Sequence, residues 1–574
     1  MSKFSDATLY LAPSGYKEGI LFPQKPLSTN GEISFTRTSS AWRTNIEGQV
    51  EEVCYNLAQY SEEFDNAYWT KALGTLTSNV INAPNGTLTA DLFTKTSAVN
   101  TVSQVSRSGS VYLQTGIHTL SVYAKQNVGN LLLLRLDNND NTANAQWNFS
   151  TKSFTNIGAN IISSSFEELS NGWFRLIVTG NVTSTTWSIS IANLFANPTN
   201  DSVYIWGAQL VKGSLPKPYL STTNRQNFPR VDYSLGTGTF LLEPQRTNLM
   251  LNSGDFQNAS WGKSTLTFNS TETAPDGTSS ARNYSTAGAF SYALQVVSVV
   301  SGQYYTSSCY LKYTSGVGSL AVRFTDGTSV NFISVTANLI NGTIGSVSYG
   351  GNGANGTATI TSVGDGWYRV TVSGTLTIAN AGFIVSNLGL GATTFSVWGG
   401  QVELGAYPST YIPTTSSAVT RLADSFSRGN IFTNNLISSS GGTWFVELQN
   451  NLAYTRDAGN QNLWVGDSST APSNSFEIRN GGAANALLTI GKRISNTFTG
   501  LYNTTTSTVK IAVKWNGTSA DVFVNGTKQI SATAFSITNM EFLAAKTEDV
   551  PKYIQQMALW RTPLTDAQCQ ELTL

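Results

Sequence analysis

The sequence predicts an all-β protein, built from tandem β-sandwiches of the jelly-roll type that follow an extended N-terminal arm. The first observation is composition: only 12 % of the 574 residues are charged, while Gly (50), Tyr (23) and Trp (13) are abundant. The usual charged share is about 25 %. Short β-branched and aromatic runs between Gly and Asn turns are typical of strands. The second observation is an internal repeat, which sets the domain organisation of a long chain.

The repeat is clearest at the two ends of each copy. Residues 206–223 read WGAQLVKGSLPKPYLSTT, and residues 398–415 read WGGQVELGAYPSTYIPTT. The openings NLAQYSEEFDNAYWTK (56–71) and NLMLNSGDFQNASWGK (248–263) have the same spacing, since 398 − 206 and 248 − 56 both give 192. The sequence therefore predicts two copies of one domain, module A (56–223) and module B (248–415).

Strand patterns inside the two modules support a sandwich. TLSVYAK (119–125) and TSSCYLK (306–312) alternate at period two, as strands do. NGWFRLIVTG (171–180) and DGWYRVTVSG (365–374) place an Asn-Gly or Asp-Gly turn directly before a strand. Many short antiparallel strands in about 165 residues indicate a jelly-roll type of sandwich.

The segments outside the modules differ in pattern. Residues 1–55 are too few for such a domain, and we expect an extended arm that packs on a neighbour, either in this chain or in another. Residues 224–247 form a connector that prolines interrupt, and residues 416–432 form a linker.

Residues 433–574 predict a third sandwich. GGTWFVELQ (441–449) reads as a strand, and TVKIAVKWNGTSADVFVNGTKQ (508–529) reads as strands with turns at its two Asn-Gly pairs. We expect the chain to end in one amphipathic helix, with Thr565 as N-cap ahead of Gln568.

Charge and hydropathy limit the partners. Lys plus Arg and Asp plus Glu number 34 each, so the net charge is zero. A neutral surface argues against nucleic acid or an anionic membrane as the main partner. The start, MSKFSDATLYLAPSGYK, has no apolar signal region, and no stretch is long enough to span a bilayer. We expect synthesis in a cytoplasm without a classical signal peptide.

The reactive residue types are few and scattered. Cys54, Cys309 and Cys569 are far apart and lack a CxxC spacing, which favours buried thiols over a disulfide framework or a zinc site. His118 is the single histidine, which argues against multi-histidine metal centres and against most acid–base schemes built on imidazole. We expect His118 to be structural.

Carboxylates give no catalytic pattern either. A glycosidase needs two carboxylates across a cleft. The pairs Glu51-Glu52, Glu62-Glu63 and Glu167-Glu168 are adjacent, so on a strand their side chains point to opposite faces, and on a loop they are solvated. We therefore predict no catalytic residues and no enzyme activity.

The sequence predicts turns at two motifs that could also indicate ligand sites. GNGANG (351–356) has no following Lys-Ser/Thr or helix, which indicates a turn instead of a phosphate site. LDNNDNT (136–142) has the oxygen-rich character of a calcium loop. The cognate FTDGTS (324–329) is an ordinary Asp-Gly turn, which favours a turn, with structural calcium as the alternative. No cofactor or metal is predicted.

Aromatic residues are the candidates for sugar platforms. Trp173, Trp206, Trp367 and Trp398 lie within strands of both copies, which favours core packing over sugar stacking. Tyr68, which is Ser260 in the other copy, and Trp42 in the arm are expected at a surface or an interface. The residues of any glycan site are unknown at this stage.

These stretches carry a family resemblance. The openings, the GWFR and GWYR strands and the closing stretches resemble the carbohydrate-binding-module-like β-sandwiches of bacteriophage structural proteins. The connector PRVDYS…FLLEPQRTNL and the exit TRLADSFS are typical of the same phage chains. The third domain looks like a concanavalin A-like, laminin-G-like sandwich, from GTWFVEL, VFVNG and ALWRTPLTDAQ.

The resemblance implies a structural protein of the virion: a fibre or other appendage on head or tail, homo-oligomeric, and anchored to other virion proteins by residues 1–55. The alternative is an adhesin that binds host surface glycan with its lectin-like C-terminal domain. One departure concerns the arm, where FTRTSSAW…IEGQVEEV runs directly into Asn56 without a PRVDY-like connector. This difference indicates an arm adapted to a particular docking site.

Overall fold

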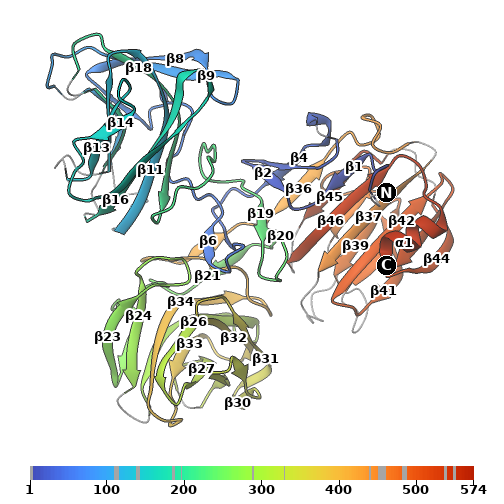
Figure 1. The fold of residues 1–574 in the computed structure, drawn as a ribbon. Coiled ribbons are helices and arrows are strands. Elements are labelled where there is room, and N and C mark those ends of the chain that lie inside the picture. The colour runs from blue at the N-terminus through green and yellow to red at the C-terminus, as the bar shows by residue number, and fades with distance from the viewer. Residues whose placement is uncertain are drawn as a thin grey trace. The chain divides into compact units, whose positions relative to one another are not determined.

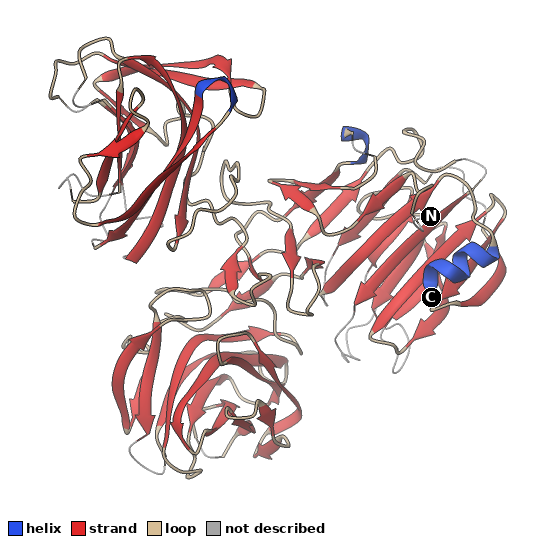
Figure 2. Cartoon of the chain, in the orientation of Figure 1, coloured by secondary structure: helices blue, strands red, loops and turns tan. Residues whose placement is uncertain are grey.

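The computed structural model describes most of the chain, and strands dominate it (Figure 2). The described residues are 4–26, 28–101, 103–108, 116–136, 142–183, 188–194, 197–286, 290–328, 330–438, 441–449, 461–480, 488–535, 540–546 and 551–574. The chain divides into two compact units, residues 54–226 and a discontinuous unit of residues 1–53 with 227–574. The predicted all-β class is confirmed, with antiparallel sheets in tandem sandwiches.

Module A consists of two six-stranded antiparallel sheets. The first has the order β14 (Ser153–Thr155), β13 (Asn144–Asn148), β12 (Leu131–Arg135), β17 (Ser188–Asn193), β10 (Gln104–Ser108), β7 (Thr70–Ala72). The second has the order β15 (Ile161–Glu168), β16 (Trp173–Val182), β11 (Gly116–Val128), β18 (Ser202–Lys212), β9 (Leu88–Lys95), β8 (Gly74–Asn82). Inward residues such as Leu120, Val122 and Leu176 form one buried core, as period-two alternation requires.

Module B repeats this design. One sheet has the order β22 (Gly262–Ser264), β25 (Tyr292–Ser298), β33 (Asn380–Ser386), β27 (Ser319–Thr325), β28 (Phe332–Asn338), β29 (Thr343–Ile344), with β30 (Ser348–Gly350) also on β28. The other has the order β23 (Leu266–Glu272), β24 (Ala281–Thr286), β34 (Thr393–Leu404), β26 (Tyr304–Gly316), β32 (Trp367–Leu376), β31 (Gly353–Ser362). The strand order of this second sheet matches that of β8-β9-β18-β11-β16-β15 in module A.

The glycine after the repeated tryptophan explains part of the shared closing stretch. Gly207 and Gly399 lie at a register shift in their central strands, with φ of 63° and 66°. A Cβ on Gly207 would lie 2.9 Å from a ring carbon of Tyr123, and one on Gly399 would lie 2.7 Å from a ring carbon of Tyr310. Only glycine fits both the left-handed backbone and this close approach.

The C-terminal sandwich contains strands from both ends of the chain. Its eight-stranded sheet has the order β19 (Arg230–Asp232), β20 (Thr239–Leu242), β46 (Lys552–Trp560), β37 (Gly442–Gln449), β42 (Thr508–Trp515), β43 (Ser519–Val524), β44 (Thr527–Ala534), with β1 (Leu9–Leu11) also on β46. Its nine-stranded sheet has the order β2 (Gly15–Lys17), β3 (Ile20–Phe22), β4 (Ile33–Thr36), β36 (Ser425–Arg428), β45 (Phe542–Lys546), β38 (Gln461–Gly466), β39 (Ser475–Asn480), β40 (Leu488–Ile494), β41 (Thr497–Thr504). Two small ribbons pair β5 (Trp42–Thr44) with β6 (Val50–Glu52), and β21 (Arg246–Asn248) with β35 (Val419–Arg421).

The N-terminal segment packs on its own chain. Leu9 pairs with Leu559, and Phe35 pairs with Phe426, so β1 and β4 lie beside strands from the other end of the sequence (Figure 1). Leu9, Phe35 and Trp444 belong to the same buried core. Of the two neighbours considered for the arm, the structure shows the one within this chain.

The end of the chain follows the sequence prediction. Helix α1 (Asp566–Thr573) starts with Thr565 as N-cap, and Thr565 and Gln568 form a capping box. Cys569 and Leu572 of this helix pack against the outer face of the eight-stranded sheet, beside Phe445. Among the described residues, no helix has the length and apolar character needed to span a bilayer.

The two loop motifs have different outcomes. GNGANG turns at residues 351–352 and then enters β31 at Gly353, so its first part is a turn and its second part is strand. The calcium-like motif 136–142 lies mostly at residues 137–141, which are outside the described residues.

Candidate functional site

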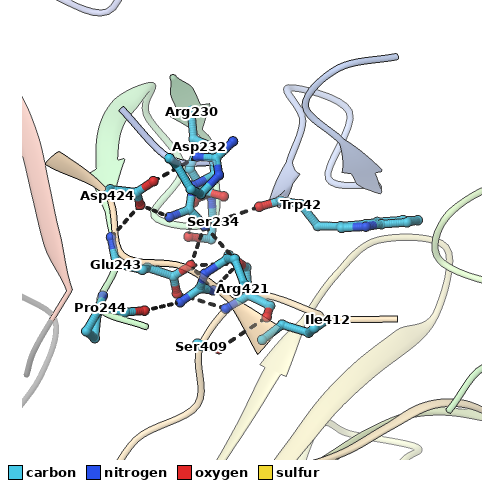
Figure 3. Close-up of polar contacts among 12 residues, drawn as sticks. Trp42, Arg230, Asp232, Ser234, Glu243, Pro244, Ser409, Ile412, Arg421 and Asp424 are labelled. Atoms are coloured by element: carbon cyan, nitrogen blue, oxygen red, sulfur yellow. Dashed lines mark hydrogen bonds and ion pairs between the residues drawn. The ribbon is translucent and has the colours of Figure 1, made fainter. Parts of the chain in front are cut away.

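A buried network of charged side chains lies where β19, β20, β35 and β36 meet (Figure 3). The Arg230 guanidinium pairs with the carboxylates of both Glu243 and Asp424. Arg421 Nη1 lies 2.6 Å from Glu243 Oε2, and the Glu243 amide donates to Asp424 Oδ2 at 2.7 Å. Each of these side chains is at most 2 % exposed.

The N-terminal segment supplies the third arginine of this network. Arg37 Nη1 lies 2.7 Å from Asp424 Oδ1, and Arg37 Nη2 donates to the Phe228 carbonyl at 2.8 Å. A third buried carboxylate, Asp232, accepts from the Thr44 amide at 2.7 Å. Three arginines therefore pair with two carboxylates, Glu243 and Asp424, while Asp232 is held by the amides of Thr44 and Ser234.

Burial and pairing act against each other on these groups. Burial alone would raise the pKa of Glu243, but Arg421 and Arg230 outweigh it and hold this pKa at about 2. Burial lowers the pKa of Arg37 to about 10, with Asp424 opposing and Arg230 adding to the shift. Burial raises the pKa of Asp232, although hydrogen bonds from Ser234 and Thr44 oppose this. At neutral pH, Glu243 and Arg37 thus remain ionised.

The chemistry of this ion network is structural. Each of the three arginines has a carboxylate partner at contact distance, and the Glu243 carboxylate also accepts from the Thr410 amide at 2.8 Å and its hydroxyl at 2.6 Å. Arg421 Nη2 donates to the Pro244 carbonyl at 2.6 Å. A side chain that is ion-paired and shielded from solvent cannot exchange protons readily with a substrate, but it can fix the segments that carry it.

The four repeated tryptophans are core residues, as predicted. Trp173, Trp206, Trp367 and Trp398 are each at most 4 % exposed. Trp206 and Trp398 hold equivalent places in the two modules, since their rings lie 4.9 Å from Tyr219 and 4.4 Å from Tyr411.

Trp42 and Tyr68 have more specific positions. Trp42 is 8 % exposed and contacts Tyr411 edge-to-face, with centroids 5.6 Å apart, so the β5–β6 ribbon covers the aromatic cluster of module B. It is an interface residue within the chain. Tyr68 is half-buried beside Tyr60, and the Arg107 guanidinium lies 4.4 Å from its ring centroid.

The other repeated residues fasten the exit of each module to its opening. The Asn56 side chain donates to the Ala208 and Leu220 carbonyls, and Asn248 donates in the same way to Gly400 and Ile412. Ser61 lies 2.9 Å from the Tyr219 hydroxyl, and Ser253 lies 2.8 Å from that of Tyr411. These matched bonds explain why the openings and closing stretches are alike.

The single histidine is buried at the start of β11. His118 is 2 % exposed, and its Nδ1 lies 3.1 Å from the Gly116 carbonyl oxygen. Burial lowers the pKa of His118 to about 4, with Lys212 adding to the shift and the Gly116 bond opposing it. His118 is therefore neutral at physiological pH. All three cysteines are buried thiols, and burial raises the pKa of Cys569 to about 12.

The adjacent glutamates do not face each other across a cleft. Glu51 pairs with Arg43 at 2.7 Å, and Glu62 accepts from the Tyr219 hydroxyl at 3.1 Å. Glu167 and Glu168 pair with different partners, at 3.4 Å from Arg175 and 2.7 Å from Lys152. In the described part of the chain, no three His, Cys, Asp or Glu side chains converge as a metal site.

An open groove of about 390 Å³ lies in module A, between β14 and β15. Phe154, Ile157 and Phe166 line it together with serine hydroxyls and Lys152. This groove could not be predicted from the sequence, because it depends on which strands end each sheet.

The ion network was also not identified from the sequence. Its signal is an arginine in three related contexts, FTRTSS, FPRVDYS and VTRLADS, in a chain with few charges. Arginines that recur in similar contexts, two of them shortly before an aspartate, indicate buried pairs in such a chain, although the pattern cannot show which copies meet.

Comparisons with known proteins found distant likenesses only. Neither the models of protein families nor the curated proteins contain a match. Among solved structures, domain 4 of AbnA, a GH43 extracellular arabinanase from Geobacillus stearothermophilus, in complex with arabinotriose, is 14 % identical, with a TM-score of 0.22. That match covers 28 % of this chain and 77 % of the arabinanase domain.

Two further structures match over longer stretches. The N-terminal CBM22-1–CBM22-2 tandem domain of Paenibacillus barcinonensis Xyn10C is 12 % identical over 67 % of this chain and 98 % of its own, with a TM-score of 0.19. The LG1–3 region of the laminin α2 chain is 9 % identical over 82 % and 98 %, with a TM-score of 0.14. With TM-scores this far below 0.5, none of the three specifies a function for this chain.

Proposed function

We propose that this chain is a non-enzymatic structural protein of a bacteriophage virion, a homo-oligomeric fibre or appendage on the head or tail. The observation that carries the proposal is the ion network, in which Arg37 pairs with Asp424 across 387 positions of sequence. A junction of this kind holds the N-terminal segment, the connector and the exit of module B in one geometry. A projecting appendage needs such fixed junctions more than it needs a reactive site.

The state of the titratable groups supports a role without catalysis. His118 is buried with a pKa near 4, so it does not titrate in the range where general acid–base catalysis by imidazole operates. Glu243 is held at a pKa of about 2 by its arginine partners. Neither group has the intermediate pKa and the access to solvent that proton transfer requires.

The place of attachment to other virion proteins is proposed within residues 1–55. Strands β1 to β4 are already paired inside this chain, so an outside partner would use the exposed parts of the segment. Ile46, at the turn of the β5–β6 ribbon, is 70 % exposed and is the most apolar feature of that turn. We propose this turn as the anchoring contact.

The test is immunogold electron microscopy of purified particles from a lysate of cells that carry the gene. The proposal predicts gold at one defined structure of the particle and the chain at fixed stoichiometry in dissociated particles. Particles that lack the chain, with the protein found only in the soluble lysate, would contradict it.

The second candidate is a glycan-binding adhesin that uses the lectin-like C-terminal sandwich. The observation in its favour is that GTWFVEL is β37, VFVNG ends β43 and ALWRTPLTDAQ runs from β46 into α1, so all three stretches lie on one sheet. An array of bacterial surface glycans probed with the intact chain tests it. Saturable binding would favour attachment, and an array without binding would leave the structural role alone.

A further inference from the structure

The groove in module A lies at an open side of the sandwich. Strands β14 and β15 each end the order of their sheet in the described chain, and the groove separates them. The rings of Phe154 and Phe166 lie at its base, 5.2 Å and 4.8 Å from the ring of the buried Trp147. Phe166 is 39 % exposed, and Ile157 at the rim is 52 % exposed.

Module B has the same side closed. In both modules a segment lies beside the corresponding strand, since Gly158 and Asn160 donate to the Asn144 and Thr142 carbonyls as β30 pairs with β28, but Val347 of module B packs on the core there. Ile360 on β31 holds the position that Phe166 holds on β15, because each pairs with an inward core residue of the neighbouring strand. Ile360 is packed on the core, whereas Phe166 lines an open groove. Module A therefore leaves exposed, at Ile157 and Phe166, apolar side chains whose counterparts in module B pack on the core.

The outer edge of β15 is regular from Ser163 to Glu168, beyond a register shift near its start. Its eight residues, Ile161–Glu168, contain no proline and no lysine, the residues that usually protect a sheet edge. Glu167 is matched by Arg175 at 3.4 Å and Glu168 by Lys152 at 2.7 Å. Both carboxylates are compensated within the chain, so a second copy would meet an edge without net charge.

We propose that this side of module A is an interface between two copies of the chain, in which β15 pairs antiparallel with β15 across a two-fold axis. A strand edge is complementary to itself in this arrangement, and each copy supplies both a groove and the exposed apolar side chains that cover one. Ile157, Ile162 (54 % exposed) and Phe166 are the residues that the contact shields. The contact joins two six-stranded sheets and does not depend on the proposed place in a virion.

Sedimentation equilibrium of the intact chain tests the interface. Phe166→Asp is expected to weaken self-association at least tenfold, because a charge in the contact has no partner. Phe268→Asp is the matched control, since Phe268 is 43 % exposed on β23, an end strand of module B, and contacts Tyr284 edge-to-face at 6.0 Å. A monomeric parent chain, or equal weakening by both substitutions, would overturn the proposal.

Cysteine crosslinking gives a second measurement that does not need a destabilising change. Ser165→Cys lies at the middle of β15, close to the two-fold axis, and the native thiols are buried. Mild oxidation should link two copies through this position. Thr359→Cys is the control, since Thr359 has the same register on β31. Crosslinking at 165 but not at 359 supports the interface, and its absence at 165 contradicts it.

Discussion

Arg230 shows how a chain with few charges uses them. Its guanidinium is fully buried between Glu243 and Asp424, so one side chain joins the connector to the exit of module B. Bringing these charges out of water is costly, and only pairing and hydrogen bonding repay that cost. The ion network therefore fixes the relative positions of the segments that carry it more than it adds net stability. Removing any single member should lower the free energy of unfolding, because it leaves a buried charge without its partner.

The first prediction concerns Asp424, which contacts two arginines. Asp424→Asn removes the charge but keeps the shape, leaving Arg37 and Arg230 with one carboxylate fewer. The free energy of unfolding of the discontinuous unit should fall by about 3–5 kcal/mol. Urea unfolding followed by tryptophan fluorescence measures it.

The control for this prediction is a pair at the surface. Asp255 is 44 % exposed and lies 2.9 Å from Arg282 Nε. Asp255→Asn should cost about 0–1 kcal/mol, because solvent screens such pairs. If the two substitutions lowered the free energy of unfolding equally, the buried ion network would stabilise the fold no more than a surface ion pair does.

The second prediction concerns pH and two buried groups of module A. Burial lowers the pKa of His118 to about 4, and burial raises the pKa of Asp91 to about 6. For His118, the stability present above pH 6.5 is lost as the pH falls towards 4, because the unfolded chain binds the proton first. For Asp91, stability present below pH 3.8 is lost as the pH rises through 6, because the folded chain holds its proton longer.

The two effects have opposite signs between pH 4 and 6.5, so they oppose each other in the parent chain. Each is on the order of 3 kcal/mol. Asp91→Asn should leave residues 54–226 clearly less stable at pH 4.5 than at pH 7, and His118→Gln should give the reverse. Urea midpoints of this compact unit at both pH values test the signs. Variants with the same pH dependence as the parent would refute the assignment.

Individual residues differed in how well the sequence predicted them. The burial of Trp206 and Trp398 followed from their place in strands of both copies, because a repeated aromatic residue inside a strand packs in the core. Trp42 was expected at a surface or an interface, and the structure places it on Tyr411 of module B. The pairing of Arg230 with Asp424 could not be predicted, since Asp424 lies 194 positions away in sequence.

At the scale of elements, the strands that precede each module in sequence pack on a part of the chain that comes after that module. The β5–β6 ribbon precedes module A in sequence but covers the aromatic cluster of module B. Strands β19 and β20 precede module B but extend the sheet of β46. This arrangement makes the connectors part of the sandwiches, so the boundaries predicted from sequence, such as 224–247, separate residues that share one sheet.

The third prediction follows from these shared sheets. A fragment of residues 433–574 lacks β1, β19 and β20 from one sheet and β2, β3, β4 and β36 from the other. The fragment also lacks the core residues Leu9, Phe35 and Phe240, so the side chains that pack against them would be exposed to solvent. We expect the fragment to aggregate or to show no cooperative unfolding by circular dichroism. The fragment 54–226, which contains both of its sheets, should unfold cooperatively; failure of that control would invalidate the comparison.

Strand content could be predicted where alternation and Asn-Gly turns were clear, as in β42 and β43 and in the capped helix α1. Strand partners at the ends of the chain could not. The Thr8 hydroxyl reaches the Leu559 carbonyl across 551 positions, and nothing in a short hydrophobic run specifies such a distant partner. Local patterns determine which residues form strands, whereas packing of the whole chain decides how β1 and β46 pair.

At the scale of the molecule, the chain has one continuous unit and one discontinuous unit. The discontinuous unit joins the N-terminal segment to residues 227–574, with β1 and β4 paired in its sheets and helix α1 packed on one of them. Because the N-terminal strands belong to the sheets of the C-terminal sandwich, we expect the two to unfold together. A substitution that destabilises the N-terminal strands should also destabilise the C-terminal sandwich.

Hydrogen–deuterium exchange of the intact chain tests this central claim most directly. Amides of β1 and β4 should exchange as slowly as those of β37 and β46, and all four should lose protection together in moderate denaturant, because they belong to one cooperative unit. Asp424→Asn should speed exchange in all four. Rapid exchange of β1 and β4 while β37 and β46 stay protected would contradict the account and would make residues 1–53 a separate arm.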